Sequence, residues 1–266
     1  MSNQKSSLGV TKFRLPPDPL RAARSLRRAL GACAPSPAHP NLQSYLGSPL
    51  PALGVRAEGI AALARRVAHE LDAWSKLRSR QLLRELWGGT TFEERALAIA
   101  ILDRRARAVG SAEWRLMDSW VDSATGWALS DALASGPIAH LVQSDPRKWN
   151  ETLAWSRSRN PWRRRAALYA QARRVRSGDL AGPFRLIDAL RSDPDSWVQR
   201  AVGTWLRECW KQDRRRTERY LWHRARTLPP IVITVSTERA SLGFRRRLRA
   251  RARRAYTGVG VRRPSS

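Results

Sequence analysis

Apolar residues recur at helical spacing along almost the whole chain between its two ends. In residues 197–209, apolar side chains return every three or four positions and leave Arg200 and Arg207 on the opposite side. This periodicity predicts an amphipathic helix with one buried face. Residues 231–235 instead have strand propensity, but the chain offers no second strand to pair with them. Because Pro229 and Pro230 can open a helix, we interpret 231–235 as helical.

Capping residues mark where several helices begin and end. Residues 90–94 contain a capping box at the start of one helix, while Gly88 and Gly89 end the preceding helix at Trp87. Three further predicted starts place a capping side chain before a proline at the first helical position. They are Asp145-Pro146, Asn160-Pro161 and Asp193-Pro194.

A short internal repeat accompanies two of these starts, because residues 144–149 return in part as residues 192–197. The offset from Ser144 to Ser192 is 48 positions, close to the ~40–47 residues of HEAT and armadillo repeats. A match this short also arises by chance. Together with the continuous helical periodicity, it favours an all-α fold, an α-solenoid of HEAT-like antiparallel helix pairs forming a single domain.

The two ends of the chain differ from this pattern. Three prolines at 16, 17 and 19 delay the first helix until about Leu20, so we expect a disordered segment at 1–17 and a domain at 18–244. Residues 244–254 carry seven arginines and no acid. We expect residues 245–266 to form a basic tail, which is either a solvated run of charge or an extra set of phosphate contacts.

The net charge limits the partners of the protein. The chain has 50 Lys and Arg against 22 Asp and Glu, which gives a formal charge of +28. Such a field indicates nucleic acid or an anionic membrane surface, and basic residues that neutralise phosphates release counterions. Nearly all of this charge is arginine, for which there are two interpretations: suitability for bidentate phosphate contacts, or a GC-rich genome. We expect nucleic acid as the partner.

Other classes of protein are disfavoured by what the sequence contains. Cys33 and Cys209 are too few for a disulfide framework, and their spacing is not that of metal ligands. No run approaches the ~20 apolar residues of a membrane span, and the polar start has no signal-peptide core. The four histidines lack partner spacing. We therefore expect a cytoplasmic protein, associated with the nucleoid through DNA, with no metal and no membrane partner.

One pair of residues has the geometry of a site. Trp127 and Asp131 are four apart and share one face of a predicted helix, so an aromatic ring and a carboxylate point together. Trp162 and Arg165 lie three apart downstream. A carboxylate is unusual on a surface that meets a polyanion. Its ordinary interpretation is an acid paired to an arginine on the next helix.

With these residues, the chain resembles the bacterial DNA alkylation repair glycosylases of the AlkD type over roughly residues 45–228. The order and spacing of several strings carry the resemblance. They are Tyr45 with Leu53-Gly54-Val55, then Leu83-Arg84-Glu85-Leu86-Trp87 before Phe92-Glu93, Trp127 with Asp131, Asn160 with Trp162 and Arg165-Ala166-Ala167, and residues 198–208.

The resemblance implies hydrolysis of the N-glycosidic bond of cationic N3- and N7-alkylpurines in duplex DNA, during base excision repair and without rotating the lesion into a pocket. It implies that Asp131 is the catalytic carboxylate, that Trp127 contacts the sugar of the lesion nucleotide and that Arg165 contacts a phosphate. A carboxylate and an indole face both stabilise an oxocarbenium-like sugar. We expect further DNA contacts at Tyr45, Trp162, Arg163, Arg164 and Trp205.

These expectations describe a monomeric, monofunctional enzyme that needs no cofactor and no obligate protein partner. The sequence departs from the family at Thr204, where a tryptophan usually completes the aromatic face, and Trp205 follows it. Because a helix turns about 100° per residue, Trp205 does not simply replace that ring. The alternative is a non-catalytic HEAT-like protein that binds damaged or structured nucleic acid through a basic concave face. A basic scaffold for RNA or ribosomes is a third interpretation.

Overall fold

The computed structural model describes residues 14–35 and 39–256, with side chains as far as Arg253. Within these residues every regular element is a helix, and no strand is present. The all-α class predicted from the periodicity is therefore confirmed. Residues 1–13 of the predicted N-terminal segment and residues 257–266 of the predicted tail lie outside the described part.

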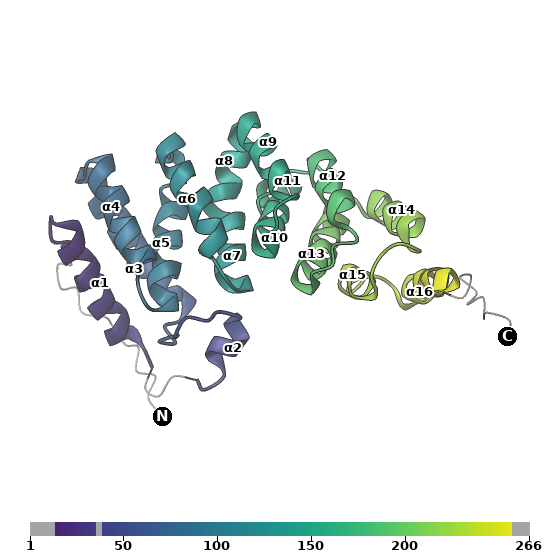
Figure 1. The fold of residues 1–266 in the computed structure, drawn as a ribbon, viewed down its shortest axis with the longest axis horizontal. Helices are drawn as coiled ribbons and strands as arrows, with labels where there is room; N and C mark the ends of the chain where they lie inside the picture. The colour runs from purple at the N-terminus through teal and green to yellow at the C-terminus, as the bar shows by residue number, and fades with distance from the viewer. Residues whose placement is uncertain (1–13, 36–38, 257–266) are drawn as a thin grey trace, which may run out of the picture. The chain divides into compact units, whose positions relative to one another are not determined.

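The described chain divides into two compact units. The first contains Pro49–Arg105 together with the described residues up to Tyr45, and the second contains Leu46–Ser48 and the residues from Ala106 onward. Each unit has its own set of packed helices (Figure 1). The domain boundaries predicted at 18 and 244 stay a prediction.

The first unit is built from helices that pack in pairs, with α3 against α5 and α4 against both α1 and α5. Its core includes the fully buried Leu26, Leu82 and Leu97. Leu15 is also buried, so the packed part begins within the segment predicted as disordered. The helices are α1 (Pro19–Cys33), α2 (Leu42–Leu46, of which Leu46 is assigned to the second unit), α3 (Ala57–Glu70), the short 3-10 turn η1 (Leu71–Ala73), α4 (Lys76–Trp87) and α5 (Phe92–Arg104).

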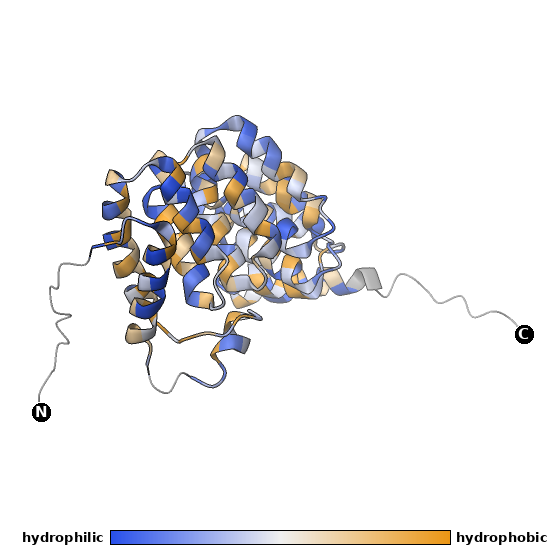
Figure 2. Cartoon of the chain, turned by 60° about the vertical axis from the view of Figure 1, so that its left-hand side comes forward, coloured by the Kyte–Doolittle hydropathy of each residue, from blue (hydrophilic) through white to orange (hydrophobic). Residues whose placement is uncertain are grey.

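The second unit has α13 at its centre, where it packs against α10, α12, α14 and α15. Hydrophilic and hydrophobic residues alternate along the helices of the chain, as expected for amphipathic helices (Figure 2). The elements are η2 (Ala106–Ala108), α6 (Ser111–Ser123), α7 (Trp127–Leu133), η3 (Ala134–Ile138), α8 (Ala139–Ser144), α9 (Pro146–Trp155), α10 (Pro161–Tyr169), α11 (Ala172–Arg176), α12 (Ala181–Leu190), α13 (Ser196–Gln212), α14 (Arg214–Arg224), α15 (Pro230–Ser236) and α16 (Leu242–Tyr256).

Most of the predicted helix boundaries are confirmed. Gly88 caps the end of α4, and Thr91 opens α5 with Glu94 completing its capping box. Asp145 and Asn160 accept hydrogen bonds from backbone N–H groups at the starts of α9 and α10. Residues 231–235 are helical, since they lie inside α15.

One predicted helix start is wrong. The dipeptide Asp193-Pro194 does not open α13, which begins at Ser196 with Asp195 as its N-cap. Asp193 is buried and binds the guanidinium of Arg164, and its Oδ1 also accepts from the backbone N–H of Asp195, the residue that caps α13. The short repeat therefore does not place its two helix starts at equivalent positions.

The described chain ends in a helix. The predicted division between domain and tail at 244 and 245 falls inside α16, which continues to Tyr256. The physical reason is local, because arginine and alanine favour helices and the stretch has no glycine or proline after Gly243. Phe244 and Leu248 are buried, and the Phe244 ring packs edge-on against Trp210 with centroids 5.4 Å apart.

Gly126 determines how the chain enters α7. Its φ of +91° is a left-handed conformation that side chains with a Cβ disfavour. A Cβ built at Gly126 would lie 2.1 Å from the carbonyl oxygen of Gly47. The entry to the helix that carries Trp127 and Asp131 therefore depends on direct contact between two backbone segments.

We expect Gly126→Ala to destabilise the protein by well over the ~1 kcal/mol that a left-handed alanine costs, because the Gly47 backbone must also move. The matched control is Gly178→Ala, where φ is +81° but no atom lies within 4 Å of the added Cβ. Urea unfolding measures both variants. Equal losses of stability at the two positions would show that the Gly47 contact contributes nothing.

Candidate functional site

Asp131 lies on α7 just before an irregular turn. The five residues of η3 form a π-type turn, and Gly136 within it has φ −93° and ψ −106°. Pro137 has no N–H to donate, which removes one bond of the helical ladder and opens the turn. The Ser135 hydroxyl donates to the Asp131 carbonyl oxygen at 2.7 Å. Such wide turns occur often at functional sites.

The Asp131 carboxylate is held by Arg165 of α10. The guanidinium donates from Nε to Oδ1 and from Nη2 to Oδ2, both at 2.7 Å. Only 15% of the Asp131 side chain and 6% of the Arg165 side chain are exposed. This geometry is the bidentate arrangement that gives the strongest carboxylate pairs in proteins. Asp131 is thus paired to an arginine of another helix, as its ordinary interpretation expects, and its catalytic role stays a prediction.

Arg165 has little capacity left for other partners. Its Nη1 donates to the Trp197 carbonyl oxygen at 2.6 Å, and Nη2 also donates to the Tyr169 hydroxyl at 3.0 Å. These bonds and the two to Asp131 occupy four of the five N–H groups of a guanidinium. At most one N–H therefore remains for the phosphate contact that the sequence predicted for this residue.

The electrostatics of the pair are set by burial and by the ion pair together. Burial raises the pKa of Asp131 above its ordinary value of 3.8, and the hydrogen bonds and positive charge of Arg165 oppose that rise. Arg165 stays charged. Without its partner, the carboxylate would be a poorly solvated acid that takes up a proton more readily.

Tyr169 contacts Arg165 through both its ring and its hydroxyl group. The Arg165 guanidinium lies 4.8 Å from the centroid of the Tyr169 ring, and this ring packs edge-on against Trp205 at 5.3 Å. Burial raises the pKa of Tyr169, so it stays a neutral phenol, and a hydrogen bond with Thr204 acts in the opposite direction. Thr204 thus joins a polar network with Tyr169 and Arg165.

Two tryptophans lie beside this network. Trp162 of α10 packs at a tilt against Trp197 of α13, with ring centroids 5.9 Å apart. Trp197 is 39% exposed and its carbonyl binds Arg165, while Trp127 at the start of α7 is half-buried. The backbone of Trp197 therefore links this ring pair to the ion pair.

The other arginines of the predicted site are also paired with acids. Arg163 binds the carboxylates of Asp118 and Asp122 on α6, with shortest distances of 2.6 and 2.7 Å. Arg164 binds the buried Asp193 at 2.6 Å. These contacts tie α10 to its neighbours. Their role in binding DNA stays a prediction.

The remaining two predicted contacts differ in exposure. Trp205 is 6% exposed and packs in the core against Tyr169. Tyr45 is 70% exposed on α2 and belongs to the first unit. The structure thus brings Asp131 and Arg165 into contact, with Trp162 linked to them through Trp197.

The sequence interpretation missed Tyr169 and Trp197 as members of this network. Tyr169 follows Arg165 by four residues, so helical spacing alone could have placed the two on one face. The role of Trp197 had no such signal, because it contributes a backbone carbonyl from a different helix. Contacts of that kind depend on the packing of α10 against α13.

The described part of the chain contains neither a metal-binding cluster nor a membrane-spanning helix. In residues 14–35 and 39–256, no group of three or more His, Cys, Asp or Glu side chains could hold a metal ion. Over the same residues, no helix is long and apolar enough to cross a membrane.

Comparison with known proteins identifies related folds. A family model described as DNA alkylation repair enzyme matches residues 26–239. A solved structure described as a predicted DNA alkylation repair enzyme from Enterococcus faecalis aligns with a TM-score of 0.68 and 18% identity, covering 77% of this chain and 97% of that one. AlkD2 from Streptococcus mutans aligns with a TM-score of 0.55 and 16% identity, covering 68% and 88%. No curated protein matches. The similar structures are consistent with the predicted HEAT-like solenoid.

We expect the Asp131 and Arg165 pair to be strongly coupled in stability. Asp131→Asn places an amide N–H against a guanidinium, and Arg165→Gln leaves a buried carboxylate unpaired, so each should cost about 3–5 kcal/mol. The double variant should lose less than the sum of the two, by roughly 2 kcal/mol or more. Urea unfolding of all four proteins completes the cycle.

The matched control for this cycle is Arg214 and Glu218, an ion pair within α14 whose arginine side chain is 65% exposed. Its coupling should stay below about 0.5 kcal/mol. Additive losses at Asp131 and Arg165 would contradict the assignment of a cooperative buried pair.

Proposed function

Since the chain belongs to the DNA alkylation repair enzyme family, we propose that it is a monofunctional DNA glycosylase that releases cationic N3- and N7-alkylpurines from duplex DNA. The observation that carries the proposal is Asp131, a largely buried carboxylate oriented by Arg165 in a chain with a formal charge of +28. The positive field attracts the duplex, and a fixed carboxylate is a feature that binding alone does not require.

The chemistry needs little from the enzyme at the leaving group. An alkylated purine already bears positive charge and departs as a neutral base, so it requires no proton. Positive charge then develops on the deoxyribose, as in other glycosidic bond cleavages. A carboxylate held in place stabilises that charge without reorganisation during the reaction. We assign this role to Asp131, which also positions the attacking water.

The ion pair leaves capacity for this role. A carboxylate has about four lone-pair sites; Arg165 occupies two of them, and the Tyr169 side chain hydrogen-bonds to the same carboxylate, which leaves about one. The exposed 15% of the Asp131 side chain is the part that a sugar or a water can reach. We assign Arg165 to orienting the carboxylate. A DNA phosphate that accepts the one remaining N–H of Arg165 partly compensates the guanidinium charge. Less of that positive charge then acts on the Asp131 carboxylate.

The aromatic residues supply the rest of the proposed site. Trp127 precedes Asp131 by four residues on α7, so its indole can face the same sugar and stabilise its charge. Trp162 and the exposed Trp197 extend an apolar surface on which the edge of the nucleotide can rest. With Thr204 in place of a tryptophan, this surface has a polar hydroxyl where the family usually has a ring.

A second function follows from one specific observation. Because Arg165 already neutralises Asp131, the same geometry serves a protein that binds alkylated DNA without cleaving it. The carboxylate is then a structural partner of the arginine. The two functions differ in whether the charge of Asp131 is needed for base release at full DNA occupancy.

We expect the wild-type protein to release 7-methylguanine or 3-methyladenine from duplex DNA, and Asp131→Asn to lower the single-turnover rate at least about tenfold. That factor equals about 1.4 kcal/mol of transition-state stabilisation. Free base is measured by chromatography with enzyme in excess, so that both proteins act on fully bound DNA.

Two controls make this comparison interpretable. Circular dichroism and thermal unfolding establish that Asp131→Asn is folded at the assay temperature, and Glu218→Gln changes a carboxylate remote in sequence from the motifs. Retained binding without base release by the wild type, for both methyl-purines and bulkier adducts, would replace the glycosylase with the binding function.

The rate of base release should fall at acidic pH as Asp131 takes up a proton. Its pKa is raised by burial, so the midpoint should lie above 3.8. Arg165→Gln removes the hydrogen bonds and charge that oppose this rise, and its midpoint should therefore move to a higher pH. Single-turnover rates from pH 4 to 8, corrected for spontaneous depurination, give both profiles. A midpoint that moves to lower pH in Arg165→Gln would contradict the assignment.

A further inference from the structure

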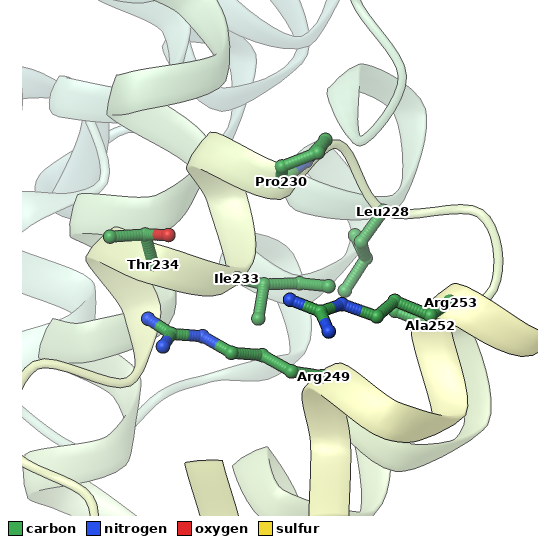
Figure 3. Close-up of a pocket in the computed structure, with 7 residues that line it drawn as sticks. All are labelled: Leu228, Pro230, Ile233, Thr234, Arg249, Ala252 and Arg253. Atoms are coloured by element: carbon green, nitrogen blue, oxygen red, sulfur yellow. The ribbon is translucent and has the colours of Figure 1, made fainter. Parts of the chain in front are cut away.

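The second unit contains a pocket far along the chain from the proposed site. It has a volume of about 280 Å³ and lies between α16 and the segment that leads into α15. Figure 3 shows its aliphatic floor and the two arginine side chains that extend over it. The lining residues are Leu228, Pro230, Ile233, Thr234, Arg249, Ala252 and Arg253.

One wall of this pocket lies beyond the family match. The family model covers residues 26–239, whereas α16 begins at Leu242. Leu248 is fully buried, and Phe244 packs against Trp210 of α13. The helix is therefore a docked part of the fold, and it closes a pocket against residues that belong to the matched region.

The two arginines in the pocket have no acidic partner within the described residues. Arg251 on the same helix stacks on Trp222 and donates to its carbonyl oxygen at 2.9 Å, which uses that guanidinium in the fold. Arg249 and Arg253 have no such contact and are exposed, four positions apart on one helical face. Like charges at this spacing repel each other mildly, and a bound anion would remove that cost.

The lining selects among possible anions. No aromatic side chain lines the pocket, so it lacks the stacking surface that an unpaired base requires. Aliphatic atoms from Leu228 and Ile233 instead suit the carbon face of a sugar. Two guanidinium groups at the rim match the oxygens of a phosphate, which arginine binds in a bidentate manner.

We propose that this pocket is a second DNA contact, in which Arg249 and Arg253 hold one backbone phosphate and the aliphatic floor receives the adjoining deoxyribose. The proposal rests on the proposed function only in taking duplex DNA as the partner. It gives α16 a defined role in affinity that is independent of the chemistry at Asp131.

The test measures binding of a fluorescent, undamaged duplex by anisotropy at several salt concentrations. We expect Arg249→Gln with Arg253→Gln to weaken binding about tenfold and to reduce the slope of log K against log salt by about 0.9, as for one phosphate. The matched control is Arg215→Gln with Arg219→Gln, an exposed pair at the same spacing on α14 that does not line the pocket. It should weaken binding at most about threefold.

A third variant distinguishes the effect of the pocket's shape on DNA binding from the effect of its positive charge. Ala252→Leu fills the floor without altering any charge, and it should weaken binding several-fold. Circular dichroism confirms that α16 is retained. Equal effects of the two arginine pairs, together with a neutral Ala252→Leu, would overturn the proposal and leave α16 as diffuse positive charge.

Two further outcomes complete the test. Unchanged duplex affinity in the pocket variants, with weaker binding to vesicles that contain anionic lipid, would overturn the proposal by assigning the pocket to another partner. Base release is assayed in parallel at saturating DNA. If the wild type releases no base but the pocket variants bind DNA more weakly, the glycosylase function fails while the second contact stands.

Discussion

The buried ion pair between Asp131 and Arg165 is the interaction on which the second unit's site depends. It joins α7 to α10, and the additional bond from Arg165 to the Trp197 carbonyl joins α10 to α13. Two charges removed from water are stable only when their geometry is good and their other polar atoms are satisfied. Here both carboxylate oxygens and four of the five guanidinium N–H groups have partners, which makes three helices mutually dependent.

Burial of the pair costs desolvation free energy, but it also strengthens the electrostatic interactions of the Asp131 carboxylate. A carboxylate in a poorly solvated position interacts more strongly with a developing positive charge than one in water. Burial alone would raise the pKa of Asp131 and favour its neutral form, so Arg165 is needed to oppose protonation. An orienting arginine also limits the carboxylate to one rotamer. Structural stability and a proposed catalytic role therefore rest on one contact, and Gly126 sets the entry of the helix that carries it.

The distribution of acids explains how a protein with so few of them positions its arginines. Arg163, Arg164 and Arg165 follow one another on α10, and each is bound by a carboxylate from another segment. These acids hold the helices together and remove local positive charge. On α16, by contrast, no acid is present in Leu242–Tyr256, and Arg249 and Arg253 extend over an apolar pocket. The arginines available for DNA are therefore those that do not form ion pairs within the described fold.

The sequence alone determined the all-α class, most helix boundaries and the two motifs that supply Asp131 and Arg165, because helical periodicity, caps and i to i+4 spacing are local properties. It could not determine that Arg165 binds Asp131, that Arg164 binds Asp193, or that α16 continues into the predicted tail as far as Tyr256 and closes a pocket. Local spacing offered no signal for the Trp197 carbonyl or for the Thr204 contact to Tyr169. Those outcomes depend on which helix faces meet, and tertiary packing decides them because buried polar groups must find partners wherever the neighbouring helices place them.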